Sequence, residues 1–322
     1  MISIIVPVHN NEGTLRRCLD SIAKQTFSNY EVCLIVNGCS DASESVCKEY
    51  EMRDKRFKVF YSDKGASRAR NQGLRQAKGN YVAFVDADDF VYACYLERMY
   101  NAINSTSAGM AVCSYDILDL QLKINKNIAI REDCQSKKYT EQVECLYVDD
   151  LLNPLWNKLY RKELIENYMN PDYIIGEDLD FNLNYLSTLP EIVYVNEPCY
   201  AYISYKSEIS KNYNQNRFQT LKALHKKVEG AFLKVEPAFV LEQHTQLVSK
   251  MQREVVFCIN ENIIVYGIKS LAFIKTILDD DSTKRLFRMH SFGRKNRIVR
   301  RIVLTNNSVL VYIFFRIGNK VK

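Results

Sequence analysis

The first third of the chain alternates short apolar runs with segments in which apolar residues recur at helical spacing. The runs are rich in β-branched residues and lack polar alternation, which is typical of strands buried on both faces. Because parallel strands need a crossover between them, usually a helix, this rhythm predicts an α/β fold with a mostly parallel sheet. The expected strands are Ile2–Val8, Val32–Val36, Phe57–Tyr61, Tyr81–Val85 and Met110–Ser114, and the expected helices are Leu15–Ile22, Ser43–Tyr50 and Ala66–Lys78, the last ended by Gly79.

The pattern changes twice along the rest of the chain. Residues 116–210 are irregular and rich in Tyr, Asn and charge, which predicts loops and short strands around a site. From Asn216 onward apolar residues return at helical spacing, and such stripes are most simply the core-facing sides of helices. We therefore expect an α/β domain over residues 1–215 and a helical region over residues 216–322.

Composition excludes several classes of protein. Hydrophobic residues make up 47% and charged residues 25% of the chain, which excludes a disordered protein and a membrane bundle. The ten cysteines form no Cys-x-x-Cys pair, so we expect reduced thiols rather than a zinc site. The sequence contains no Gly-x-Gly and no Walker loop, which excludes those phosphate-binding motifs. It shows no signal-peptide pattern and no apolar run near the ~18–20 residues of a spanning helix, so a cytoplasmic protein is expected.

The net charge of +6 comes from one end of the chain. Residues 282–322 hold eleven of the 44 Lys and Arg residues and none of the 38 Asp and Glu residues. With the apolar run Val309–Phe315, this segment predicts peripheral contact with an anionic membrane face, where each basic residue contributes ~1 kcal/mol. The alternative is a solvated basic helix whose apolar run packs on the body of the protein. No nucleic-acid-binding module is recognisable, so nucleic acid is not an expected partner.

Three carboxylates stand at the end of the fourth expected strand, in Asp86-Ala87-Asp88-Asp89. Ligands of open α/β sheets bind beyond the carboxyl ends of the strands. Three anions that leave an apolar strand repel one another unless a cation compensates them. Mg²⁺ and Mn²⁺ prefer such oxygen ligands, often one or two carboxylates together with substrate phosphates. The alternative is an acidic turn in which Asp89 caps a helix that carries Tyr95, Leu96 and Met99.

Several segments, taken in their order and spacing, resemble the family-2, inverting glycosyltransferases of bacterial surface-polysaccharide synthesis. The resemblance covers about residues 1–210 and implies the GT-A fold, a Rossmann-like, mostly parallel sheet flanked by helices. The segments are Ile4-Ile5-Val6-Pro7-Val8-His9-Asn10, Asn37-Gly38-Cys39-Ser40-Asp41-Ala42-Ser43, Gly65-Ala66-Ser67-Arg68-Ala69-Arg70-Asn71, Gly79-Asn80-Tyr81, Val85-Asp86-Ala87-Asp88-Asp89, Trp156-Asn157-Lys158 and Gly176-Glu177-Asp178.

The resemblance implies roles for the acidic residues. Asp88 would be the direct ligand of Mn²⁺ or Mg²⁺, Asp86 would lie near the metal and the nucleotide ribose, and Asp89 would order the turn or contact the sugar. A metal there would stabilise the charge that develops on the leaving diphosphate. In the pair Glu177-Asp178, Asp178 matches the base that accepts the proton of the acceptor hydroxyl. The alternative for this pair is an N-terminal cap of a helix, and the two roles are compatible.

The implied nucleotide pocket is where this sequence departs from the family. Asn37 stands at a position where the family has an acidic residue that binds uracil, and Asp63 stands where the family often has Asn. We hypothesise that the two residues have exchanged roles; the alternative is a loosened base pocket or a different nucleotide. His9 would pack on the base or simply end a strand, and Arg70 would reach the nucleotide.

Further substrate contacts are expected around this pocket. Trp156, the single tryptophan, would stack on a sugar ring or fill the core. Lys158 would neutralise nearby carboxylates or touch the substrate. The remaining candidates implied by the resemblance are Pro7, Asn10, Glu12 and Ala87.

These features together predict a cytosolic, metal-dependent, inverting hexosyl- or N-acetylhexosaminyltransferase. The expected donor is a nucleotide-diphosphate sugar, with UDP favoured, and the expected acceptor is a hydroxyl of a glycan or of a lipid-linked saccharide at the inner face of the cell membrane. Two alternatives stay open at this point. One is a nucleotidyltransferase that acts on sugar phosphates, and the other is a non-catalytic, membrane-recruited module that binds nucleotide sugars.

Overall fold

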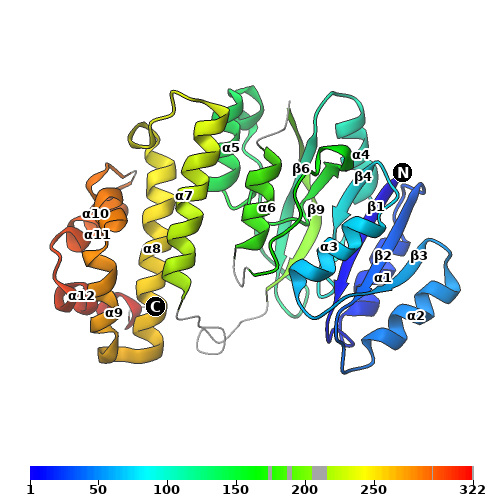
Figure 1. Ribbon diagram of the computed structural model, residues 1–322, viewed down its shortest axis with the longest axis horizontal. Helices are drawn as coiled ribbons and strands as arrows, with labels where there is room; N and C mark the ends of the chain where they lie inside the picture. The colour runs from blue at the N-terminus through cyan, green and yellow to red at the C-terminus, as the bar shows by residue number, and fades with distance from the viewer. Residues whose placement is uncertain (173–175, 187–190, 205–215, 292, 321–322) are drawn as a thin grey trace. The chain divides into compact units, whose positions relative to one another are not determined.

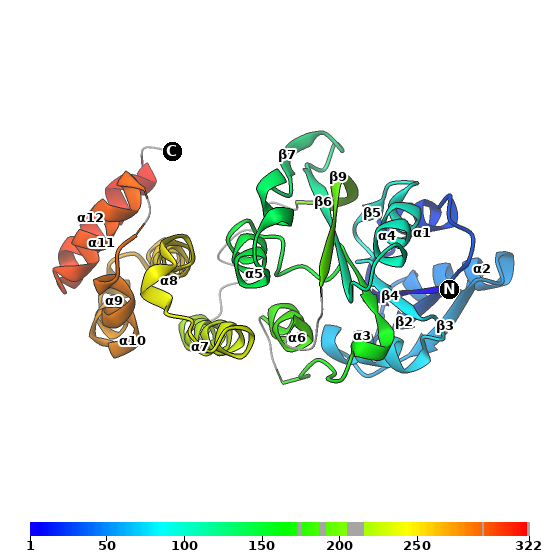
Figure 2. The ribbon, with the colours of Figure 1, turned by 90° about the horizontal axis from the view of Figure 1, so that it is seen from above.

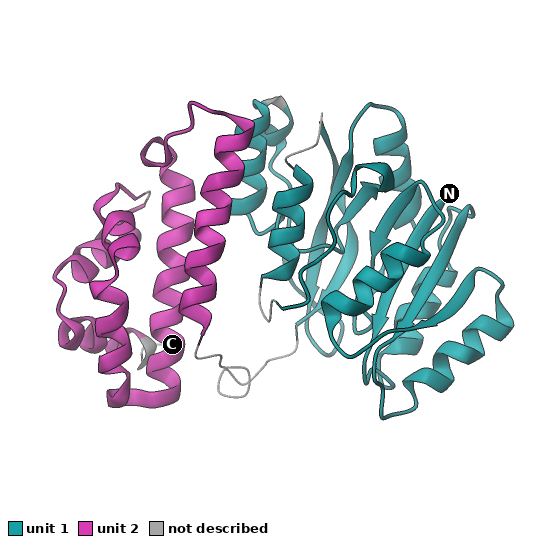
Figure 3. Ribbon diagram, viewed as in Figure 1, with its two compact units in different colours: residues 1–205 teal, residues 206–322 magenta. Residues whose placement is uncertain are grey.

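The computed structural model describes residues 1–172, 176–186, 191–204, 216–291 and 293–320 (Figure 1). Internal contacts divide the chain into two compact units, Met1–Tyr205 and Lys206–Lys322 (Figure 3). The domain boundary predicted near residue 215 falls within residues 205–215, outside the described part of the chain.

One sheet organises the first unit. Its strands run in the order β3-β2-β1-β4-β8-β6-β9-β5, and β7 pairs with β6. The strands β1 to β4 are parallel, and β6 is parallel to β9, whereas β5, β7 and β8 run antiparallel to their neighbours. The strands are β1 (Ile2–Val8), β2 (Tyr30–Val36), β3 (Phe57–Tyr61), β4 (Tyr81–Phe84), β5 (Phe90–Val91), β6 (Met110–Leu118), β7 (Ile124–Ile128), β8 (Lys158–Arg161) and β9 (Ile192–Ile203).

Helices cover both faces of this sheet, and the predicted α/β fold is confirmed. Figure 2 shows α3 (Ala66–Gln76) and α6 (Glu177–Leu186) on one face, and α1 (Leu15–Ala23) and α4 (Tyr95–Asn104) on the other. The central strand β1 is therefore covered on both sides, which explains why Ile4 and Ile5, neighbours that point to opposite faces, are both buried. The unit also contains α2 (Ser43–Arg53) and α5 (Tyr139–Val148).

The helix α3 packs so closely on β1 that one of its positions requires glycine. A Cβ atom at Gly73 would lie 2.3 Å from Cγ2 of Ile5. The helix ends at Gln76, two residues earlier than predicted, and Gly79 does not terminate it. Gly79 is needed for a different reason, since a Cβ there would lie 2.7 Å from the carbonyl oxygen of Met1. This close packing fixes α3 against the strands whose ends form the site.

Residues 116–210 contain more regular structure than the sequence predicts. They include α5, α6 and the twelve-residue strand β9, which is parallel to β6 with a shift of register near Ser114. The strand β9 has no regular aliphatic stripe because its buried positions include Cys199 and Tyr200, and the ring of Tyr200 packs on other aromatic rings. A search for aliphatic periodicity therefore misses it.

The second unit is helical, as predicted. Its described helices are α7 (Arg217–Val235), α8 (Thr245–Tyr266), α9 (Leu271–Asp279), α10 (Asp281–Arg288), α11 (Arg294–Leu304) and α12 (Ser308–Lys320). In the described residues one stretch, Thr245–Asp279, is long and apolar enough to cross a membrane by length and composition. The sequence shows no apolar run of that length because polar residues such as Glu261 and Asn262 interrupt this stretch, whereas its mean hydropathy alone reaches the level of a spanning helix. Both of these residues are buried, as in a core helix.

Candidate active site

A pocket of about 260 Å³ lies at the carboxyl ends of β1, β2 and β4. Val8 pairs with Val36 in the parallel register of β1 and β2, so the segments that follow both strands leave the sheet at one edge. The loop before α3 adds a further wall. The pocket is lined by Pro7, His9, Asn11, Asn37, Lys64, Gly65, Ala66, Arg70, Asp86, Ala87 and Asp88.

Four of these lining residues were not predicted as substrate contacts: Asn11, Lys64, Gly65 and Ala66. Gly65 and Ala66 belong to a segment that carries the family resemblance, and Gly65 has a φ of +134°, which side chains disfavour. Lys64 could have been predicted as a cation at the pocket because it directly precedes this segment in the sequence.

Two loops at the edge of the pocket hold each other in place. The side chain of Glu12 accepts a hydrogen bond from the backbone N–H of Ala42 (2.9 Å), and Asp41 accepts one from the N–H of Glu12 (3.0 Å). Asn10, with a φ of +55°, accepts from the N–H of Ser40 (2.8 Å). The structure therefore places Asn10 and Glu12 in contacts between loops and not on the pocket lining.

Asn37 is buried, and its amide bonds to the backbone. Nδ2 donates to the carbonyl of Val8 (3.0 Å), and Oδ1 accepts from the N–H of Gly65 (3.3 Å). The carbonyl of Asn37 lies 2.8 Å from Nδ1 of His9, so Nδ1 is the donor, and His9 also lines the pocket. Asp63 is exposed and is not among the lining residues. The proposed exchange between Asn37 and Asp63 stays a prediction.

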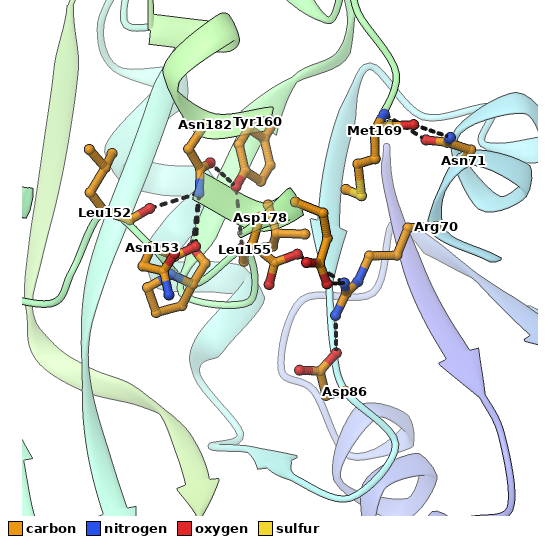
Figure 4. A network of polar contacts seen from close by, with 12 residues as sticks. Arg70, Asn71, Asp86, Leu152, Asn153, Leu155, Tyr160, Met169, Asp178 and Asn182 are labelled. Carbon is orange, nitrogen blue, oxygen red and sulfur yellow. Dashed lines mark hydrogen bonds and ion pairs between the residues drawn. The ribbon is translucent and has the colours of Figure 1, made fainter. Parts of the chain in front are cut away.

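Arg70 joins the acidic turn to the first turn of α6 (Figure 4). Its Nη2 donates to Asp86 (3.0 Å) and its Nη1 to Asp178 (2.9 Å), with Glu177 at 3.9 Å. The side chain is only 8% exposed, and burial of an arginine is tolerable only when anions compensate it. Among the described residues, Nε of Arg70 is a buried donor without a partner.

Asp86 and Asp88 supply the hard oxygen atoms that a divalent cation requires. Burial, followed by the charge of Asp86, raises the pKa of Asp88, so a cation at this place would relieve both effects. No group of three His, Cys, Asp or Glu side chains in the described part of the chain could hold a metal by itself. Two carboxylates that share a cation with a substrate diphosphate fit this donor set.

Asp89 does not cap the following helix, so the alternative of an acidic capping turn is wrong. The helix α4 begins at Tyr95 without a side-chain cap. Asp89 is 1% exposed, and its carboxylate accepts from the N–H of Ile203 (2.7 Å) and from the hydroxyl of Tyr200 (2.9 Å). A contact between residues 114 positions apart outweighs the local one, and Asp89 orders the acidic turn.

Asp178 occupies the first turn of α6, together with Glu177. Burial raises the pKa of Asp178 to about 7, although Arg70 opposes this shift. A carboxylate with such a pKa accepts a proton more readily near neutral pH than an ordinary aspartate does. Acidic residues in a first helical turn also favour the helix dipole, so the capping and base readings remain compatible.

Trp156 and Lys158 lie in the interior. Trp156 is 7% exposed and stacks on Tyr200, with ring centroids 4.3 Å apart, so the structure places it in the core. Lys158 is fully buried, and its ammonium donates to the carbonyls of Leu151 (2.7 Å) and Pro154 and to the side chain of Asn157. Burial lowers the pKa of Lys158 to about 7. Neither residue lines the pocket.

The sequence is similar to known glycosyltransferases. Residues 3–169 match the family model described as Glycosyl transferase family 2. The chain is 31% identical over 265 residues to glycosyltransferase GlyA of Streptococcus pneumoniae serotype 4 (strain ATCC BAA-334 / TIGR4), a match that covers 78% of this chain and 37% of GlyA. It is 30% identical over 240 residues to putative glycosyltransferase EpsH of Bacillus subtilis (strain 168), covering 72% and 69%. The matched region thus spans about a third of GlyA and about two-thirds of EpsH.

The fold is similar to solved structures at low sequence identity. S. aureus TarS 1-349 in complex with UDP-GlcNAc matches with a TM-score of 0.69 at 19% identity, over 98% of this chain and 92% of that one. The mannosyltransferase PcManGT of Pyrobaculum calidifontis, in complex with GDP-Man and Mn²⁺, matches with a TM-score of 0.52 at 14% identity, over 97% and 86%. At such identities the likeness concerns the fold.

Proposed function

Because the chain belongs to glycosyl transferase family 2, we propose that it is an inverting, metal-dependent enzyme that transfers a sugar from a nucleotide-diphosphate donor to an acceptor hydroxyl. The family membership sets aside the nucleotidyltransferase alternative. UDP is the favoured nucleotide, and the similarity in fold to TarS, solved with UDP and with UDP-GlcNAc, supports this choice.

The observation that carries the proposal is the bridge made by Arg70. Asp86, at the donor pocket, and Asp178, the proposed base, bind the two terminal nitrogens of one buried guanidinium. An inverting transfer needs a base on the side of the anomeric carbon opposite to the leaving group. The bridge holds the proposed base at a fixed position relative to the turn that would receive the diphosphate.

The chain's own residues would divide the work as follows. The second oxygen of Asp178 accepts the proton of the acceptor hydroxyl, whose oxygen then attacks the anomeric carbon. Lys64 and Arg70, which both line the pocket, would offer positive charge to the diphosphate. Asp88 and Asp86 would hold Mn²⁺ or Mg²⁺, and the bound metal would supply charge stabilisation for the leaving diphosphate.

A donor panel tests this function. UDP-glucose, UDP-N-acetylglucosamine, GDP-mannose and a dTDP-sugar are compared for nucleotide release with Mn²⁺ and with a chelator. We expect release from one UDP-sugar, its loss in the chelator, and a comparable loss in Asp88→Asn. Asp119→Asn, a change in the turn between β6 and β7, serves as the control that keeps activity. Donor turnover that is indifferent to the chelator would contradict the proposed mechanism.

We also propose that the second unit docks on an anionic membrane that presents a lipid-linked acceptor. Four basic residues of α11 are exposed, and α12 keeps an apolar outer side with Val309, Ile313 and Ile317 exposed while Val311 and Phe315 are buried. A pocket of about 630 Å³ between α8, α11 and α12 has a mostly apolar lining that suits a lipid chain. The four residues of α11 are Arg294, Lys295, Arg297 and Arg301.

A further inference from the structure

Three aromatic rings form a stack next to the acidic turn, and the outermost one is exposed. The ring of Trp156 is nearly parallel to that of Tyr200 (16°) and to that of Tyr202 (7°), with centroids 4.3 Å and 5.6 Å away. Tyr115 meets Trp156 edge to face at 4.6 Å. Tyr200 and Trp156 are buried, whereas Tyr202 is 38% exposed. The stack therefore presents one aromatic ring, that of Tyr202, to the outside.

The strand that carries Tyr202 is fastened to the acidic turn. Phe90 of β5 pairs with Ala201 of β9 in antiparallel register, and continuing this register by one residue sets Asp89 opposite Tyr202. The bond from the N–H of Ile203 to Asp89 (2.7 Å) extends the attachment. Burial, followed by the charges of Asp89 and Asp88, raises the pKa of Tyr202, as expected for a phenol beside carboxylates.

We propose that the exposed face of Tyr202 binds a pyranose ring of the acceptor saccharide, an inference that rests on the function proposed above. A sugar ring has an apolar face of C–H groups that packs well on an aromatic ring. The donor diphosphate has charged partners in the pocket, whereas a neutral acceptor sugar needs a neutral surface near the acidic turn. Trp156, which the sequence offered for this role, instead supports the Tyr202 ring from beneath.

The single tryptophan supplies a direct measurement. Because Trp156 is the only tryptophan of the chain and stacks on Tyr202, its fluorescence reports on this surface. Wild-type protein with UDP and Mn²⁺ is titrated with the methyl glycosides of glucose, galactose and N-acetylglucosamine. We expect a saturable change with at least one glycoside, its retention in Tyr202→Phe and its loss in Tyr202→Ala. A lack of response to all three glycosides, or a response that persists in Tyr202→Ala, would overturn the proposal.

Kinetics separate this inference from the proposed function. With the glycoside that responds as acceptor, Tyr202→Leu, which keeps Trp156 covered, should raise the acceptor KM by up to about tenfold. The donor KM and the metal-dependent hydrolysis of the UDP-sugar should stay at wild-type values. Tyr168→Leu, at another exposed tyrosine (51%), is the matched control. An unchanged acceptor KM in Tyr202→Leu would contradict this inference alone. Absent donor hydrolysis in the wild type would contradict the proposed function.

Discussion

At the scale of single residues, Arg70 both compensates two carboxylates and fixes their relative positions. Its two terminal nitrogens bind different carboxylates, which a lysine ammonium with a single nitrogen cannot reproduce in the same positions. We therefore expect Arg70→Lys to lower kcat about 100-fold, since small displacements of a reacting group have effects of that order. Steady-state kinetics with the active UDP-sugar measure this. Arg68→Lys, at an exposed position of the same helix, is the control, and equal losses in both variants would refute the argument.

The role of Asp178 as base gives a second prediction at this scale. Asp178→Asn keeps the shape of the side chain and an oxygen that can face Arg70, but it removes the proton acceptor. Transfer should fall by about 10²–10⁴-fold, while the affinity for UDP changes little. Transfer assays and UDP titrations measured on one preparation provide the test. A loss of UDP binding that parallels the loss of transfer would instead assign Asp178 to the donor site.

The pH dependence follows from the same residue. Burial raises the pKa of Asp178 to about 7, so the carboxylate that accepts the proton is depleted below that pH. The wild-type kcat/KM should therefore rise with pH and level off above about 7. A profile between about pH 5 and about pH 9, with protein stability checked at each point, measures this limb. A profile that is flat down to about pH 5 would show that the free enzyme has no such base.

At the scale of elements, Asp89 ties the acidic turn to β9. Its carboxylate satisfies the N–H of Ile203 and the hydroxyl of Tyr200, and both donors lie in the interior. Asp89→Ala would leave them unpaired, at about 1–3 kcal/mol each, so we expect a marked loss in the free energy of unfolding. Asp88→Ala is the neighbouring control, expected to lose metal binding with little loss of stability. Urea unfolding of both variants tests this, and equal stabilities would contradict the structural role of Asp89.

The same elements show what the sequence can predict. The strands β1, β2 and β4 are found because burial on both faces makes them largely apolar, and the acidic turn is found because it follows β4. The strand β9 is missed because it lacks a regular aliphatic stripe, and the two-residue strand β5 is missed because it pairs across more than a hundred positions, as Val91 does with Tyr200. The local cap pattern of Asp89 is misleading because its partners are equally distant in the sequence. Motif spacing locates Asp86, Asp88 and Arg70, but only the fold shows that Arg70 connects the turn to Asp178.

At the scale of the whole molecule, the structure sorts the basic residues of the last segment. Arg285 pairs with Glu229, and Arg300 donates to the carbonyls of Phe287 and Arg288, so these two cations have structural partners. The exposed cations of α11 are a separate set, which includes Arg297 and Arg301. The excess positive charge of the sequence therefore divides into a part that holds the second unit together and a part that is available to a surface.

This division gives the last prediction. The double variant Arg297→Glu, Arg301→Glu should bind vesicles that contain phosphatidylglycerol at least about tenfold more weakly than the wild type, because each basic residue near an anionic surface contributes about 1 kcal/mol. Binding of the wild type should also weaken with salt, as screening requires. Vesicle co-sedimentation measures both effects. The matched control is Arg53→Glu, Lys58→Glu, two exposed cations of the first unit, which should bind as the wild type does. Equal binding of the wild type to neutral and anionic vesicles would refute electrostatic docking, because a charge-driven contact must distinguish the two surfaces.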